Sequence, residues 1–136
     1  YGLREALRLL REEGLDNVFA RHIRHGEATR RAVRAWGLDI LCLNPVEYSP
    51  VLTTVVMPGD KGADAYRDAV LEKFNMSLGN GLGILKDRVF RIGHLGDFSD
   101  LMLIGTLGGV EMGFALRSVP YKQGGVMAAL DYLAAT

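Results

Sequence analysis

The sequence contains very little cysteine, no net charge and no long apolar run, and each of these shortages narrows what the protein can be. Its one cysteine, Cys42, cannot form a disulfide within the chain, and we expect it to be a small buried core residue. Sixteen Lys and Arg residues balance sixteen Asp and Glu residues. Because nucleic-acid-binding proteins usually carry a basic excess, we expect no nucleic-acid partner. No apolar run reaches the roughly 18 residues that span a bilayer, so we expect no membrane partner.

What is present is typical of one globular domain. The 136 residues suffice for a single domain with its own core, and the composition is 49% hydrophobic and 24% charged. A lone thiol fits a reducing compartment, so we expect a cytoplasmic protein. The chain opens at Tyr1, already inside a helical pattern and without an initiator methionine. We therefore expect a fragment, and whether a targeting segment precedes Tyr1 stays open.

Apolar periodicity predicts an alternation of helices and short strands. Helices are expected over 1–13, from an N-cap at Asp16 to Gly37, over 65–74, over about 100–117 with Ser99 or Asp97 as N-cap, and around 126–133. Strands are expected over 38–44, 51–58 and 88–96, and a short one over 76–78. This order favours an α+β fold with two layers, a small mostly antiparallel sheet covered by helices on one face.

A glycine-rich loop precedes the last predicted strand. Residues 79–97 read GNGLGILKDRVFRIGHLGD. The G-x-G-x-G spacing approaches a dinucleotide-binding fingerprint, but that fingerprint requires a helix directly after it, and here loop and strand follow. Two readings remain for this loop, a flexible turn or a bare backbone that approaches a ligand closely. Its candidate residues are Asn80, Gly81, Leu82 and Gly83.

Arg91 is the residue most in need of explanation, because it lies within the strand pattern VFRIG. Arginine is rarely buried unless something pairs with it. In a strand it shares a face with Val89 and Gly93, and we expect Gly93 to leave room for a small ligand. A planar guanidinium binds a carboxylate through two parallel hydrogen bonds, which lysine cannot copy. Arg91 is therefore a candidate carboxylate-binding residue; a surface arginine and an internal salt bridge remain alternatives.

Other polar residues give weaker signals. His22 and His25 lie three apart beside Glu27, but no third ligand shares their face, so we expect no metal site. His94 could serve as an acid or base near Arg91, or be a packed histidine. The arginines at 21, 24, 30, 31 and 34 form a basic helix face, either solvated or in contact with acids elsewhere in an assembly. No Ser-His-Asp or Cys-His arrangement presents itself, so no catalytic residue is predicted in this chain.

Four stretches together carry a family resemblance: YGLREALRLLREEGLDNVFARH, LTTVVMP, FNMSLGNGLGILKDRVFRIGHLGD and GVEMGFA. In this order they resemble the C-terminal part of class V aminotransferases, in the serine–glyoxylate and alanine–glyoxylate branch. The resemblance implies a homodimeric pyridoxal-phosphate enzyme of fold type I, with a large cofactor domain before a small C-terminal domain. Residues 1–37 would be helices leading from the large domain, and 38–136 the small substrate-binding domain. In the family's R-I-G-x-L-G pattern the arginine grips the substrate α-carboxylate, which gives that role to Arg91.

The sequence departs from the family in lacking a suitable cofactor lysine. Its four lysines, Lys61, Lys73, Lys86 and Lys122, do not end an apolar strand, where the family's lysine sits. We therefore expect no catalytic or cofactor-binding residue here, and an inactive fragment of an enzyme that transfers an amino group from serine or alanine to glyoxylate. Two alternatives stay open, namely a stand-alone module that binds small carboxylates and a dimer-interaction domain using Arg24 and Arg31.

Overall fold

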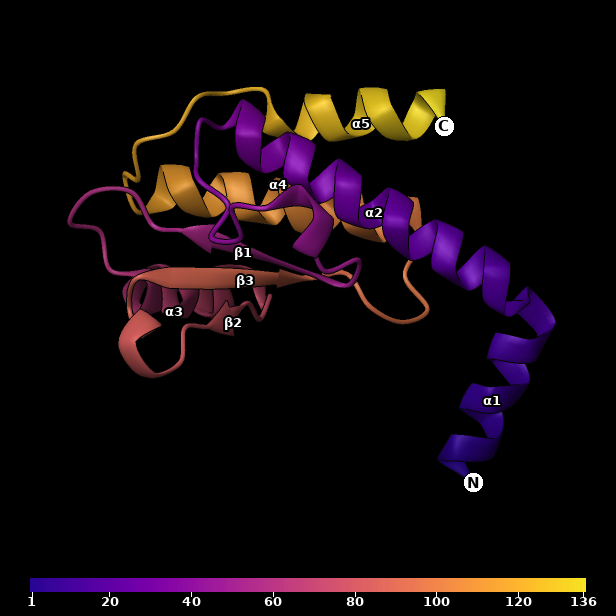
Figure 1. Ribbon diagram of the computed structural model, residues 1–136. Helices are drawn as coiled ribbons and strands as arrows, with labels where there is room; N and C mark the ends of the chain where they lie inside the picture. Colours follow the sequence, from indigo (N-terminus) through magenta and orange to yellow (C-terminus); the bar gives the residue numbers. More distant parts are fainter.

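Five helices and three short strands alternate along the chain in the computed structural model, which describes all residues, 1–136 (Figure 1). The helices are α1 (Gly2–Glu13), α2 (Leu15–Ala35), α3 (Ala63–Phe74), α4 (Asp100–Leu116) and α5 (Gly125–Ala135). The strands are β1 (Leu52–Val56), β2 (Gly79–Asn80) and β3 (Val89–Gly93), and 3₁₀ turns lie at Pro45–Glu47 and Gly83–Leu85. No helix is both long and apolar enough to cross a membrane.

The three strands form one antiparallel sheet in the order β1-β3-β2, so β3 is central. Successive side chains of a strand point to opposite faces, which gives the sheet two different sides. One side, the covered face, consists of Thr53, Val55, Phe90 and Ile92. The other side, the open face, consists of Leu52, Thr54, Val56, Gly79, Val89, Arg91 and Gly93.

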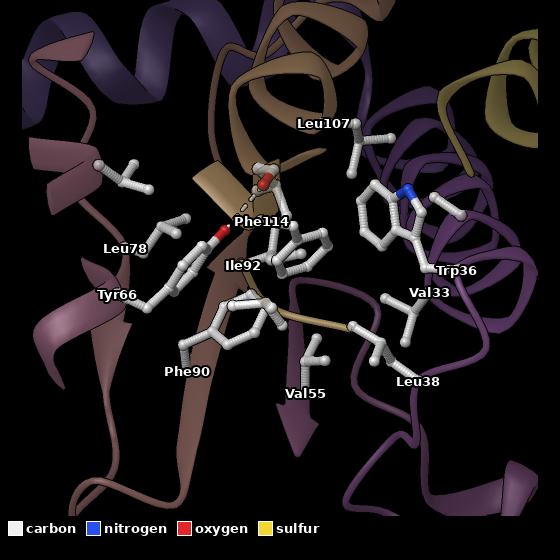
Figure 2. Packing of buried hydrophobic residues seen from close by; sticks show 14 of the residues in the cluster. Val33, Trp36, Leu38, Val55, Tyr66, Leu78, Phe90, Ile92, Leu107 and Phe114 are labelled. Atoms are coloured by element: carbon white, nitrogen blue, oxygen red, sulfur yellow. Dashed lines mark hydrogen bonds between the residues drawn. The ribbon is translucent and has the colours of Figure 1, made fainter. Parts of the chain in front are cut away.

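The covered face forms the floor of the hydrophobic core. Phe90 and Ile92 are fully buried beneath the helices (Figure 2). The Tyr66 ring on α3 and the Phe114 ring on α4 lie 5.0 and 6.0 Å from the Phe90 ring, between centroids, which are favourable aromatic separations. The Tyr66 hydroxyl donates a hydrogen bond to the Val110 carbonyl over 3.0 Å, so even this buried polar group is satisfied. The α+β fold with helices on one face of a small antiparallel sheet is thus confirmed.

Two of the predicted strands are wrong. Of residues 38–44, only Ile40 forms a bridge, to Val55, before the chain turns into the Pro45–Glu47 3₁₀ turn. The short strand lies at 79–80 rather than at 76–78, because the residues that find partners on β3 are Gly79, opposite Arg91, and Asn80, opposite Phe90. Both segments have the apolar composition of a strand, but a residue joins the sheet only where another strand offers it a hydrogen-bonding partner.

Helix boundaries are mostly as expected, with one cap misassigned. Gly14, rather than Asp16, is the N-cap of α2, and no side chain caps that helix. Ser99 caps α4, where its hydroxyl accepts from the Met102 amide over 3.3 Å. Cys42 is half-buried in the segment after α2 and lies outside the core. The helix α1 has no buried residue and projects away from the sheet (Figure 1).

Candidate functional site

Arg91 is the charged group of the open face, and nothing in the chain pairs with it. The residue is half-buried, and its Nε atom is shielded from solvent without a hydrogen-bond partner. By contrast, Arg21, Arg24 and Arg30 each have a carboxylate within 2.6 to 3.3 Å. An unpaired buried donor costs free energy, so such a group marks either strain or a partner supplied from outside the chain.

The Arg91 side chain leans over the edge strand β2. Gly79 is its cross-strand neighbour, and a β-carbon added at position 79 would lie 3.0 Å from both Cβ and Nε of Arg91 and 3.5 Å from Cζ. The expectation that Gly93 leaves room for a ligand on this face stays a prediction, but the space around Gly93 is open. A β-carbon at Gly93 would meet nothing within 4 Å, so the glycine that adjoins Arg91 is Gly79.

The glycine loop begins directly after this contact and closes one end of the open face. Gly81 is buried, and a β-carbon there would overlap the carbonyl oxygen of Leu85 and lie 3.0 Å from a methyl group of Val89. Gly83 adopts a left-handed backbone with φ of 55°, which favours glycine. Leu82, between them, exposes 66% of its surface. The loop therefore covers Val89 and presents an apolar tip to solvent.

Asn80 is directed away from Arg91. It lies opposite Phe90 in the register, so it belongs to the other side of β2, and its Nδ2 donates to the Gly81 carbonyl over 3.2 Å. Strand pairing therefore brings the start of the predicted loop beside Arg91, but through Gly79 and not through the Asn80 side chain.

His94 is not positioned to act with Arg91. It follows β3 on the side of Phe90 and Ile92, has no exposed surface, and lies 3.0 Å from the Thr53 hydroxyl through Nε2. Burial lowers the pKa of His94 to about 4, and the nearby positive charge of Arg30 adds to this shift. The side chain is a neutral, packed histidine beneath α2, and strand alternation alone would have placed it opposite Arg91.

The other two histidines are engaged in hydrogen bonds that hold α2 in place. His22 Nδ1 lies 2.7 Å from the Val18 carbonyl, and its Nε2 accepts from the Gly96 amide over 3.1 Å. His25 Nε2 lies 2.9 Å from Asp100 on α4. Since each ring faces a different protein partner, the pair provides local structure.

Acids and aromatic rings of the same chain pair with the basic face of α2. Arg24 donates to Asp100 over 2.6 Å, and this hydrogen bond, with a smaller contribution from His25, holds the pKa of Asp100 below its usual value although burial opposes the shift. Arg31 pairs with Glu27 at 3.1 Å and lies over the Tyr132 ring at 4.4 Å. The remaining arginines have comparable partners, Arg21 with Glu13 and Arg30 and Arg34 with Glu27.

Chemically, the site can bind an anion and orient it. The Nη atoms of Arg91 have no partner in the chain and are not shielded as Nε is, so they point the charged end of the guanidinium outward. A carboxylate docking on the two Nη atoms would gain two charge-assisted hydrogen bonds. Apart from the Thr54 hydroxyl, the open face carries no nucleophile or acid–base group, so the site in this chain is one of binding.

The chain is similar in sequence to aminotransferases. No protein-family model matches the sequence. The chain is 48% identical over 136 residues to a serine–glyoxylate aminotransferase of Arabidopsis thaliana and 45% identical over 136 residues to one of Methylorubrum extorquens. In each case 98% of this chain aligns with 33% of the relative, so the chain spans about a third of the length of the relatives it matches.

Comparison of the fold with solved structures also finds aminotransferases. The crystal structure of a ureidoglycine–glyoxylate aminotransferase from Bacillus subtilis superimposes with a TM-score of 0.90 at 30% sequence identity, covering 97% of this chain and 34% of that one. The matched region is the C-terminal part of such proteins. The resemblance to the C-terminal part of class V aminotransferases, predicted from the four sequence stretches, is confirmed.

Proposed function

Because this chain matches the C-terminal part of class V aminotransferases in sequence and fold, we propose that it is the substrate-binding part of such an enzyme, which transfers an amino group from serine or alanine to glyoxylate. The observation that carries the proposal is the unpaired guanidinium of Arg91 on the open face of the sheet. Serine–glyoxylate activity is the activity of the relatives named above, and it supports serine as the donor.

Arg91 binds the carboxylate of each substrate in turn. Both the amino acid and the 2-oxo acid of an amino-group transfer carry a carboxylate bonded directly to the reacting carbon, so one arginine serves both halves of the reaction. Two parallel hydrogen bonds fix the plane of that carboxylate and hence the direction of the bonds at the neighbouring carbon. Holding a reactant in one orientation is a large contribution to rate, so Arg91 contributes through orientation and not through bond-making.

The cofactor proposed for the whole enzyme is pyridoxal 5'-phosphate, and the residues of this chain do not fit the task of holding it. Such enzymes need a lysine amine at the cofactor. All four lysines of the chain are exposed, and none ends β1 or β3: Lys61, Lys73, Lys86 and Lys122. The catalytic and cofactor-binding residues are therefore proposed to lie in another part of the enzyme, and this chain alone is expected to be inactive.

The architecture of the whole enzyme follows from the same resemblance. We propose that residues 1–37 lead from a large cofactor domain and that 38–136 form the small domain. We also propose a homodimer in the cytoplasm. Arg24 and Arg31 already have partners within the chain, so they give no support to a module whose purpose is dimer contact through these two residues.

Two measurements test the proposal. The first is the coding sequence upstream of Tyr1, which should encode an α/β domain with a lysine at the end of a strand. The second compares Arg91→Ala with the unchanged complete enzyme, using serine and its decarboxylated analogue as amino donors. Loss of one partner of a buried charge pair costs about 2–5 kcal/mol. We therefore expect kcat/KM for serine to fall roughly 30-fold to several thousand-fold, with Arg91→Lys intermediate.

The decarboxylated analogue provides the internal control. It has no carboxylate for Arg91 to bind, so its rate should be unchanged in Arg91→Ala. Equal losses for both donors would mean that Arg91 has a structural role and would overturn the carboxylate assignment. A start codon directly before Tyr1, with no enzyme domain, would favour the alternative of a stand-alone module that binds small carboxylates.

A further inference from the structure

We propose that Gly79 is a positioning residue for Arg91: its missing side chain is what allows the guanidinium to lie across the edge strand β2. The inference rests on the proposed role of Arg91 in carboxylate binding. It assigns part of that role to a residue that cannot itself bind a substrate through a side chain. The two positions lie opposite each other in the β2–β3 register.

The space at position 79 is already taken by Arg91. A methyl group there would stand 3.0 Å from both Cβ and Nε of the arginine. Carbon atoms in good contact are about 3.5–4.0 Å apart, so one of the two residues would have to move. Gly79 is not among the residues with positive φ. Its backbone suits any amino acid, so the requirement for glycine comes from space and not from backbone conformation.

The strand cannot easily retreat from an added methyl group, because both of its ends are anchored. Leu78 is 4% exposed in the core, and its carbonyl accepts a hydrogen bond from Arg67 Nε over 2.8 Å. Arg67 is itself held by Asp64 at 3.2 Å. On the other side, Gly81 is packed against Leu85 and Val89. Since the backbone is held at both ends, a side chain at 79 displaces mainly the arginine.

The contact with Gly79 also determines which atoms of Arg91 remain available. Nε lies against the edge strand and is shielded from solvent, whereas the Nη atoms are not shielded. A carboxylate therefore docks end-on, on the two Nη atoms. If a side chain at 79 lifts the guanidinium off the strand, the charge remains but the two hydrogen bonds no longer point in the same direction.

The experiment places Gly79→Ala in the complete enzyme and uses the same pair of amino donors. A displacement of about 1 Å at a positioning group can cost about 100-fold in rate, and a methyl group shifts the arginine by less. We expect kcat/KM for serine to fall about 10- to 100-fold while the decarboxylated analogue is unaffected. Gly105→Ala is the matched control, because a β-carbon on that exposed position of α4 meets nothing within 4 Å. It should leave both rates unchanged.

The double variant separates a positioning role from a merely structural one. In the Arg91→Ala background there is no guanidinium to displace, so adding Gly79→Ala should cost less than twofold. A further 10-fold loss in that background, or an equal loss for both donors in the single variant, would overturn the role of Gly79. An Arg91→Ala variant that loses both donors equally would instead overturn the proposed function, so the two failures are distinguishable.

Discussion

On the covered face of the sheet, Phe90 and Ile92 have no exposed surface, whereas Arg91 between them has unpaired donor groups on the open face. The same five-residue strand thus carries two kinds of residue in alternation. Near the covered face, the Tyr66 hydroxyl donates to the Val110 carbonyl and His94 Nε2 lies 3.0 Å from the Thr53 hydroxyl, although His94 Nδ1 is buried without a hydrogen-bond partner. The open face contains a charge that the chain does not balance, and our proposal supplies its partner from outside the chain.

The covered face should control stability, and the largest expected effect lies there. Phe90→Ala removes a fully buried ring that contacts the rings of Tyr66 and Phe114. Such a truncation leaves a cavity and costs about 3–5 kcal/mol. The free energy of unfolding of the 136-residue chain, measured by urea denaturation, should fall by this amount. A loss below about 1 kcal/mol would mean that the covered face is not the core of the fold.

A second effect on this face comes from pH through His94. The folded-state pKa of about 4 lies below the ordinary value of 6.5, so the unfolded chain takes up a proton that the folded chain refuses. Stability from this residue is therefore complete above pH 6.5 and is lost as the pH falls toward 4. One pKa unit corresponds to about 1.4 kcal/mol, so the loss approaches about 3 kcal/mol.

The measurement is the free energy of unfolding at pH 7 and pH 5, in the unchanged chain and in His94→Gln. Glutamine keeps a hydrogen-bonding group near Thr53 but cannot titrate. The free energy of unfolding of the variant should therefore depend less steeply on pH than that of the unchanged chain. Identical pH dependence in both chains would show that His94 is not held neutral by the fold.

The alternation of side chains between the two faces of β3 could be predicted from the sequence, and so could most of the helices. Period-2 alternation places Arg91 and His94 on opposite sides, although the sequence interpretation did not use this to separate them. The helices were predictable because their apolar spacing is a local property. Arg91 itself stood out because an arginine within a strand pattern needs a partner.

What could not be predicted depends on strand pairing between distant residues. The sequence offers several glycines near Arg91, and only the β2–β3 register shows that Gly79 rather than Gly93 adjoins it. The segment 38–44 looks like a strand, yet only Ile40 finds a partner. Likewise the partner of Arg24 is Asp100, 76 residues away, which no helix pattern reveals. Non-local contacts decide these features.

Like the open face of the sheet, α1 presents side chains that have no packing or bonding partner within the chain. This helix has no buried residue, and Leu3 and Leu7 expose 75% and 50% of their surface. Apolar surface without a partner favours association. We expect the 136-residue chain to self-associate in sedimentation experiments, and the double variant Leu3→Glu, Leu7→Glu to do so about tenfold more weakly, a change of about 1.4 kcal/mol. A monomer at high concentration that binds no apolar dye would contradict this.

The smallest expected effect is the sharpest test of the comparison, because it concerns the residue next to Phe90. Arg91→Ala should change the free energy of unfolding of the 136-residue chain by no more than about 0.5 kcal/mol. The substitution removes no ion pair and no hydrogen bond. It also removes a shielded Nε donor that has no partner, and this gain offsets the lost packing of the arginine stem on Gly79. Urea denaturation of both variants under one set of conditions measures the two changes in the free energy of unfolding.

If Arg91→Ala costs the chain 1.5 kcal/mol or more, the arginine supports the sheet itself, and the open face is not reserved for a ligand. If it costs nothing while Phe90→Ala costs several kcal/mol, two adjacent residues of one strand serve separate ends: the phenylalanine stabilises the fold, and the arginine is kept in place by it.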